Sequence, residues 1–433
     1  MKISPYLILC VLYVNTFAVF GQTQSINSSP PLAEARPESA GMSSERLARI
    51  DAMAGKLVDE GNLPGMVALV AREGKIVYLK SFGAANAEGE PLRTDHIFRI
   101  ASQTKAITST AVMMLWEAAK FRLDDPIAQY IPEFTGPQLL DTYDEESGEY
   151  TTKDATGEIT IRQLLTHSSG IGYGVISEDP RFKRIYEEAG IVDLVTTENY
   201  TIEENVKKLA KLPLHHNPGE AWTYSLGLDV LGYLIEIVSD MKFDRFLRTR
   251  IFDPLGMSDT WFFLPDDKTD RLVDVLHKKD GGWKKYPVTF YDPDYPRTGA
   301  KTFFSGGGGL SSTARDYAAF LQMYLNGGEL NGVRILSRTT VDVIMANQLV
   351  DPVLFGGENS DQGLAFAVVT SKGQSRGGAG SEGTFQWGGY FNTTYWADPR
   401  ENMIGILLKQ TRGEVSDPSD WMFRQLVGAA IDD

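Results

Sequence analysis

Cysteine is nearly absent from this 433-residue chain, and positive charge is in deficit. The single cysteine, Cys10, lies in an apolar N-terminal stretch. A chain cut after that stretch has no thiol for a disulfide or for nucleophilic catalysis. Lys plus Arg number 42 against 57 Asp plus Glu, a net charge of −15, and no basic stripe offsets it. We therefore expect neither nucleic acid nor an anionic membrane surface as a partner.

Histidine is also scarce, and its spacing predicts no metal site. No pair has H-E-x-x-H spacing, and two of the histidines are adjacent, so their side chains point in different directions. We predict that His167, in "LLTHSSG", is a packed or hydrogen-bonded structural residue. No phosphate-binding or dinucleotide fingerprint occurs, so no cofactor is expected. The five histidines are His96, His167, His215, His216 and His277.

The N-terminus predicts export. Lys2 precedes a mostly apolar run over residues 3–20, and Val19 and Gly21 suit a cleavage site, so residues 1–21 are predicted to be a signal peptide. The alternative is a retained membrane anchor, because the run is almost long enough to span a bilayer. Asn15 and the small residues at the exit favour cleavage. The expected location is secreted or periplasmic.

The remaining chain is predicted to be a flexible lead, residues 22–40, followed by one catalytic domain, residues 41–433. From Ser44 onward, Leu47, Ile50, Leu57 and Val58 share a helical face. Two apolar runs, 66–71 and 76–82, flank "REGK" as a β-hairpin. Strand-like runs at 363–372, 384–392, 393–397 and 403–410 come late, and an amphipathic helix closes the chain at 419–431.

This order predicts an α+β fold, in which the early hairpin joins the late strands in one antiparallel sheet flanked by the terminal helices. The α/β part is expected at about 41–100 and 300–433, with a mostly helical subdomain inserted over about 101–299. The acidic stretch 141–158 is expected on the surface. Thr313 and Asp316 have the spacing of a capping box.

Two serine motifs compete for the role of nucleophile. Ser375 lies in "GQSRG", which matches the G-x-S-x-G nucleophile elbow of α/β-hydrolases. We predict a Gly-rich loop there, with no helix after it and no histidine downstream, so Ser375 is not expected to be the nucleophile. Ser102 and Lys105, in "SQTK", lie on the same face of a helix predicted to begin near residue 102. The free N–H groups and positive end of that helix would point at the site.

Lys105 must be neutral to act as a base for Ser102. A lysine titrates near ~10.4 in water, and burial or a nearby cation lowers that value by up to roughly 3–5 units. A neutral Lys105 would accept the Ser102 proton. The pattern alone leaves open a helix start that merely contains a lysine. A second S-x-x-K, at Ser239 and Lys242, lies at the end of an apolar helical run instead of the start of one.

Further stretches of the sequence favour a catalytic role for Ser102 and Lys105. "SQTK", "LLTHSSGIGYG", "HNPGEAWTYSLGLDVLGYLIE", "SGGGGLSSTARDY" and "FQWGGY" resemble, in order and spacing, the serine β-lactamase and penicillin-binding-protein superfamily over residues 41–431. The chain is most similar to the class C β-lactamase-like esterases, called family VIII. The resemblance implies that Ser102 is the nucleophile, that Lys105 is its base, and that Tyr224 relays protons with Lys105. It also implies an oxyanion hole made by the backbone N–H groups of Ser102 and Tyr390.

Two departures from the family pattern bear on substrate. Leu226 stands where lactamases have an asparagine that contacts a substrate amide, and Trp387 stands where they have a lysine that holds a substrate carboxylate. The residues expected to contact the substrate are Leu226, Trp387, Gly388 and Gly389, and Trp387 with flanking Phe385 and Tyr390 would make a flatter and more apolar site. Such a site suits small or medium uncharged acyl esters. The alternative for Trp387 is ordinary strand packing.

The sequence therefore predicts a secreted serine hydrolase that cleaves carboxylic esters through an acyl-enzyme, with weak β-lactam hydrolysis as a side activity. A true β-lactamase or D-alanyl-D-alanine carboxypeptidase remains an alternative, as does an acyltransferase with an acceptor other than water. A non-catalytic ligand-binding domain of the same fold is a further alternative. The intact set of Ser102, Lys105 and Tyr224 argues against it, because a binding domain needs none of the three.

Overall fold

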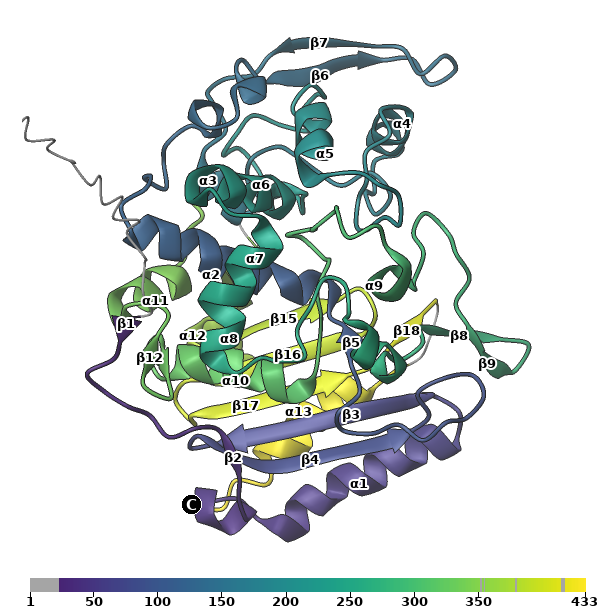
Figure 1. Ribbon diagram of the computed structural model, residues 1–433, viewed down its shortest axis with the longest axis vertical. Coiled ribbons are helices and arrows are strands. Elements are labelled where there is room, and N and C mark those ends of the chain that lie inside the picture. The colour runs from purple at the N-terminus through teal and green to yellow at the C-terminus, as the bar shows by residue number, and fades with distance from the viewer. Residues whose placement is uncertain (1–22, 351–352, 354, 378–379, 414–416) are drawn as a thin grey trace, which may run out of the picture.

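An eight-stranded sheet forms the centre of the molecule (Figure 1). The computed structural model describes residues 23–433 except 351–352, 354, 378–379 and 414–416. The strand order is β13-β14-β15-β16-β17-β3-β4-β2. The strands are β2 (Ala33–Glu34), β3 (Gly65–Arg72), β4 (Lys75–Gly83), β13 (Ser360–Gln362), β14 (Ala367–Val369), β15 (Phe385–Gly389), β16 (Thr393–Asp398) and β17 (Met403–Leu408).

The predicted pairing of the early hairpin with the late strands is confirmed. β3 and β4 form an antiparallel hairpin whose turn places Glu73 and Gly74 at positive φ. β17 pairs antiparallel with β3, with Ile406 opposite Leu69. Every residue of β3 is buried, because helices cover both faces of the sheet there.

The terminal helices α1 (Ser44–Asp59) and α13 (Ser419–Gly428) cover one face of the sheet, as predicted. Ser43 caps α1 by accepting a hydrogen bond from Arg46 N. Leu47, Ile50 and Leu57 are buried against Met66 and other sheet residues, whereas Val58 is half-exposed.

The other face carries α2 (Thr104–Glu117) and α10 (Ala314–Leu325). In Figure 1, α2 lies between the sheet and the helices α3 and α6 of the inserted part. Residues of α2 are buried almost all round, which places its N-terminus inside the molecule between sheet and insertion.

The inserted part is mostly helical but also holds two hairpins. β6 (Gln138–Tyr143) and β7 (Tyr150–Asp154) form the predicted surface excursion, and all of β7 is exposed. β8 (Leu276–Lys279) and β9 (Gly282–Lys285) join β18 (Thr411–Arg412). The helices are α3 (Ile161–Leu165), α4 (Pro180–Glu188), α5 (Ile202–Leu209), α6 (Gly227–Ser239), α7 (Phe243–Leu247), α8 (Asp253–Leu255) and α9 (Tyr295–Thr298), with α11 (Arg338–Met345) after α10.

Three local expectations differ from the structure. The lead is not free of structure, because β2 pairs in parallel with β4 and β1 (Thr23–Gln24) pairs with β12 (Val333–Arg334). The expected Gly-rich loop around Ser375 is a short helix, α12 (Ser371–Arg376). Thr313 caps α10 by accepting a hydrogen bond from Asp316 N. The Asp316 carboxylate does not complete the capping box, because it accepts hydrogen bonds from Asp259 N and Thr260 Oγ1 instead.

Across the described ranges, none of the helices combines the length and apolarity that a bilayer crossing requires. The predicted signal peptide, residues 1–21, lies outside the described residues.

Candidate active site

The candidate nucleophile lies on a tight turn at the start of α2. β5 (Phe98–Arg99) leads into a 3₁₀ turn, η2 (Ala101–Gln103), and Ala101 takes a positive φ of 43°. From residue 96 to residue 113 Ser102 alone is more than slightly exposed. The turn therefore presents one hydroxyl to solvent at the N-terminus of a buried helix, where N–H groups lack intrahelical partners.

Lys105 lies one turn further on with its amine at the centre of three contacts. The side chain is 4% exposed, and Nζ donates to Ser102 Oγ at 3.4 Å, to Tyr173 OH at 2.9 Å and to Gly307 O at 2.7 Å. Lys105 has no ion-pair partner within 4 Å among the described residues. The amine is thus held by neutral acceptors beside the serine.

Tyr224 completes the predicted group of three. Lys105 Nζ lies 4.5 Å from the centre of the Tyr224 ring and 5.3 Å from that of Tyr173, so the amine lies against two phenol rings. The two rings are 5.4 Å apart. Tyr224, more than 100 positions further along the chain, is therefore brought next to Lys105 and Ser102.

Tyr173 is the residue that sequence reasoning missed. It lies in the stretch "LLTHSSGIGYG", only six residues after His167, but no spacing rule links it to Lys105. Burial, reinforced by Tyr224 and Asp229, raises the pKa of Tyr173 well above its usual range, so the phenol stays neutral. A neutral phenol accepts the bond from Lys105 and orients the amine.

The two tyrosines are separable by mutation. Tyr224→Phe keeps the ring against Lys105 and removes the hydroxyl, so we expect kcat for an ester to fall by roughly 10²–10³-fold. Tyr173→Phe removes one of three acceptors of the amine, and we expect a loss of roughly 10- to 100-fold. Steady-state kinetics with one ester tests both. A larger loss from Tyr173→Phe than from Tyr224→Phe would reverse the two roles.

Two buried titratable groups adjoin this cluster. Asp229, on α6, is 2% exposed and accepts from Gly307 N at 3.2 Å. Burial raises its pKa to about 6, although hydrogen bonds and the charge of Lys105 act in the opposite direction. His167 is packed and hydrogen-bonded as predicted, with Nδ1 2.9 Å from Ser225 Oγ and its ring 4.7 Å from that of Tyr224. Burial lowers its pKa, so His167 is neutral.

Asp229 makes the stability of the protein depend on pH. Its folded pKa of about 6 lies above the ordinary 3.8, so the native state binds this proton more tightly than the unfolded chain does. Its contribution to the unfolding free energy therefore falls, by up to about 3 kcal/mol, as pH rises from 4 to 7. Asp229→Asn lacks this dependence. Urea unfolding at several pH values should show the variant gaining stability relative to the parent as pH rises; a constant difference would contradict the assignment.

The stretch "FQWGGY" approaches the turn that carries Ser102 through strand β15. A Cβ built on Gly389 would lie 2.5 Å from Ile100 O, so only glycine allows the strand to pass this close. Tyr390 follows, and its ring packs against Phe290 and under Arg412, whose guanidinium carbon is 3.6 Å from the ring centre. Strand β15 thus passes beside the turn that carries Ser102 at the residue before Tyr390, and the oxyanion hole stays a prediction.

Trp387 belongs to a circuit of four half-buried aromatic rings, which we call the aromatic cluster. Its ring lies 5.7 Å from Phe355 and 6.1 Å from Tyr224. Trp222 closes the circuit, at 5.0 Å from Phe355 and 5.9 Å from Tyr224. Because one of these rings is Tyr224, which lies against Lys105, the cluster gives the candidate site an apolar wall.

Two residues expected to shape this wall do not reach it. Leu226 is 0% exposed, because it lies in the turn that begins α6 and packs in the core. Its predicted contact with substrate is therefore wrong for this structure. Phe385 shares a face of β15 with Trp387 but lies deeper, 2% exposed, against Phe366 and Tyr324.

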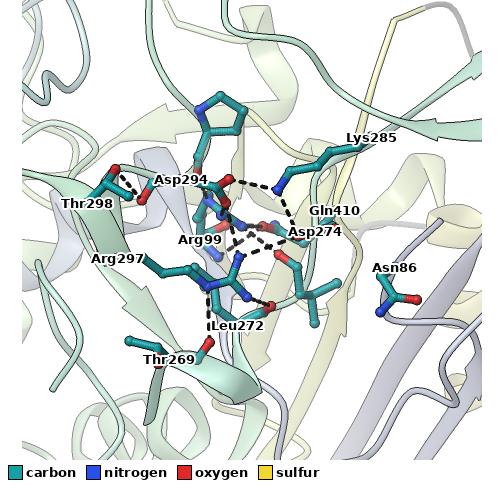
Figure 2. A network of polar contacts seen from close by, with 12 residues as sticks. Asn86, Arg99, Thr269, Leu272, Asp274, Lys285, Asp294, Arg297, Thr298 and Gln410 are labelled. Carbon is teal, nitrogen blue, oxygen red and sulfur yellow. Dashed lines mark hydrogen bonds and ion pairs between the residues drawn. The ribbon is translucent and has the colours of Figure 1, made fainter. Parts of the chain in front are cut away.

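A buried ionic network holds the start of the nucleophile turn (Figure 2). Arg99 is fully buried and donates to Val273 O at 2.6 Å, to Pro293 O, and to Gln410 Oε1 at 3.2 Å. Its guanidinium lies 3.5 Å from Asp294, which in turn pairs with Lys285 and Arg297. The network ties Arg99, three positions before Ser102, to the segment 285–297 and to Gln410, two residues after the end of β17.

The rival serines lack the neighbours that catalysis needs. Ser375 is exposed and donates to Lys372 O within α12. Ser239 donates to Ile235 O at 2.5 Å in α6, while Lys242 pairs with Glu236. No three His, Cys, Asp or Glu side chains converge as metal ligands in the part of the chain that is described.

A serine on a helix-start turn, a buried amine beside it and an apolar wall define a serine hydrolase of the penicillin-binding type. The comparison with known families agrees, since the beta-lactamase family model matches residues 50–429. The chain therefore belongs to the beta-lactamase family, and within it is a serine hydrolase that acts on esters.

Three relatives place the chain within that family. Protein Rv1367c of Mycobacterium tuberculosis is 32% identical over 368 residues, covering 82% of this chain and 88% of that protein. Esterase EstB of Burkholderia gladioli is 30% identical over 400 residues, covering 88% and 95%. The solved structure of EstCE1, described as a hydrolase with promiscuous acyltransferase activity, matches with a TM-score of 0.74 and 26% identity over 88% of this chain and 98% of EstCE1.

Proposed function

We propose that the protein is an exported hydrolase that cleaves carboxylic esters of small to medium acyl groups through an acyl-enzyme on Ser102. Lys105 and Tyr224 carry the proton. The observation that supports this most strongly is the position of Lys105 Nζ, 3.4 Å from Ser102 Oγ and against the Tyr224 ring. Tyr173 OH and Gly307 O accept two hydrogen bonds from Nζ, and these bonds hold the amine within reach of the serine hydroxyl.

The reaction follows in two halves. Ser102 Oγ attacks the ester carbonyl carbon while its proton moves to Lys105, and the backbone N–H groups of Ser102 and Tyr390 stabilise the oxyanion. The proton then passes, with Tyr224, to the leaving alkoxide as the C–O bond breaks, which leaves an acyl-serine. Water attacks this ester by the same route, and the acid and free Ser102 are released.

The aromatic cluster supports an uncharged substrate. Trp387 and its three ring neighbours offer apolar surface where a substrate carboxylate would need a cation. An ester without a negative charge loses less by leaving water for such a wall than a penicillin does. We therefore propose an esterase and not a β-lactamase as the main activity.

A comparison of p-nitrophenyl butyrate with nitrocefin tests this preference. We expect kcat/KM for the ester to exceed that for nitrocefin by a large factor; a preference for nitrocefin would overturn the esterase proposal.

Trp387→Lys should move the same ratio toward nitrocefin by roughly tenfold or more, because it restores a charged hydrogen bond to the carboxylate. Trp421→Lys on α13 is the matched control, since Trp421 is 56% exposed on the terminal helix that covers the opposite face of the sheet. An equal effect of both substitutions would leave Trp387 with no part in substrate selection.

We also propose export with removal of residues 1–21. N-terminal sequencing of the protein recovered outside the cytoplasm should begin near residue 22. Recovery of the uncut chain in the membrane would favour the retained anchor.

A further inference from the structure

A second apolar surface adjoins Ala101, the residue before Ser102, and the ring of Tyr390. A cavity of about 440 Å³ opens between the segment after Tyr173, helix α4, the segment 191–196 and Phe290. Its volume is in the range of ligand pockets in other proteins. The apolar side chains that line it are Val175, Tyr186, Ile191, Val192, Val195 and Phe290. We call this cavity the side pocket.

The walls of the side pocket continue into the catalytic centre at three points. Gly174, in the wall, directly follows Tyr173, which accepts the hydrogen bond of Lys105. Val195 packs in one small core with Ala101, the residue before the nucleophile. The Phe290 ring lies 6.5 Å from that of Tyr390, the proposed oxyanion donor.

The polar side chains around the side pocket leave its interior suited to an apolar ligand. Asp193 is 6% exposed and accepts bonds from Gly174 N, at 2.9 Å, and from Val175 N, so its carboxylate is used to shape the wall. Lys183 and Glu187 are exposed residues of α4.

The mouth of the side pocket carries apolar side chains that no part of the described chain covers. Val175 is 42% exposed, Ile176 43% and Phe290 42%. Large apolar side chains gathered at one exposed place mark a surface that another molecule covers. Because the walls of the pocket contact Ala101 and Tyr390, the substrate itself is the molecule in question.

We propose that the side pocket binds the unbranched alkyl chain of the substrate's acyl group, and that Phe290 and Val192 set the length of chain the enzyme prefers. This inference rests on the ester hydrolysis proposed above. Phe290, in the wall of the pocket, packs against Tyr390, so a chain attached to the carbonyl carbon would extend toward the pocket while the carbonyl oxygen lies in the proposed oxyanion hole. The aromatic cluster is then left for the alcohol.

A series of p-nitrophenyl esters from acetate to decanoate tests the proposal with a constant alcohol. We expect kcat/KM to rise by up to roughly fourfold per added methylene until the pocket is filled. Phe290→Ala should flatten this rise, with a loss that grows with chain length. Val192→Trp should fill the pocket and move the optimum to shorter chains, which keeps the test decisive if Phe290→Ala fails to fold.

Val288→Ala is the control, because Val288 is 67% exposed on the same segment and does not line the pocket. It should leave the chain-length profile unchanged. A second series, acetate esters of ethanol to octanol, separates the two halves of the substrate. A chain-length rise that appears only there, and is lost in Phe290→Ala, would assign the pocket to the alcohol and overturn the proposal.

An equal effect of Phe290→Ala on every ester would also overturn the side pocket as a chain site. Failure of the esterase proposal has a different signature, namely no Ser102-dependent hydrolysis of any ester in either series.

Discussion

Ser102→Ala is expected to reduce ester hydrolysis by roughly 10⁴-fold or more and to abolish labelling by a fluorophosphonate probe. The reason is that Ser102 supplies the only hydroxyl that reaches solvent on the turn before α2, 3.4 Å from the amine of Lys105. Removal of the attacking oxygen leaves the oxyanion hole and the binding surfaces without a covalent step.

The chain provides two matched controls for this substitution. Ser375→Ala removes the serine of the hydrolase-elbow motif, and Ser239→Ala removes that of the second S-x-x-K. Both should keep full activity and labelling, since each hydroxyl donates to a backbone carbonyl oxygen within its own helix. Labelling that survives in Ser102→Ala but disappears in Ser375→Ala would move the nucleophile to α12.

Lys105→Met should lower kcat by roughly 10³–10⁴-fold with little change in KM, because methionine fills the same space but accepts no proton. The substitution also deprives Gly307 O and Tyr173 OH of their donor, so we expect about 1–3 kcal/mol of destabilisation. Lys242→Met changes the lysine of the second S-x-x-K, which pairs with Glu236, and should be neutral.

Thermal unfolding separates the two effects of Lys105→Met. If the variant is folded and its kcat stays low at temperatures well below its unfolding midpoint, the loss of activity comes from the loss of the base. A folded Lys105→Met variant with the parent's kcat would show that the proton leaves Ser102 by another route.

The order of elements could be predicted from local patterns because each pattern is enforced by burial on one face. Leu47, Ile50 and Leu57 mark α1 at helical spacing, and the turn between β3 and β4 needs the positive φ that Glu73 and Gly74 adopt. The pairing of β3 with β17 follows because both strands are apolar except for Arg72 at the end of β3, and such strands are buried inside a sheet that is covered on both faces.

Contacts between distant segments could not be predicted in the same way. Tyr173 and Lys105 are 68 positions apart, and their hydrogen bond depends on how the insertion packs over α2. The burial of Leu226 depends on the turn into α6. The burial of Phe385 depends on its packing against Tyr324 of α10. Pairing of β2 with β4 was missed because a two-residue strand carries no periodic signal.

The covalent intermediate offers the most direct test of the central claim, that Ser102 is acylated with Lys105 as its base. A p-nitrophenyl ester mixed with the enzyme and quenched within the first turnover, followed by intact-mass measurement and peptide mapping, reports it. The account predicts a burst of nitrophenol and a mass increase of one acyl group on the peptide that holds Ser102. An acyl group on a peptide with Ser375 or Ser239, or turnover with neither burst nor adduct, would contradict it.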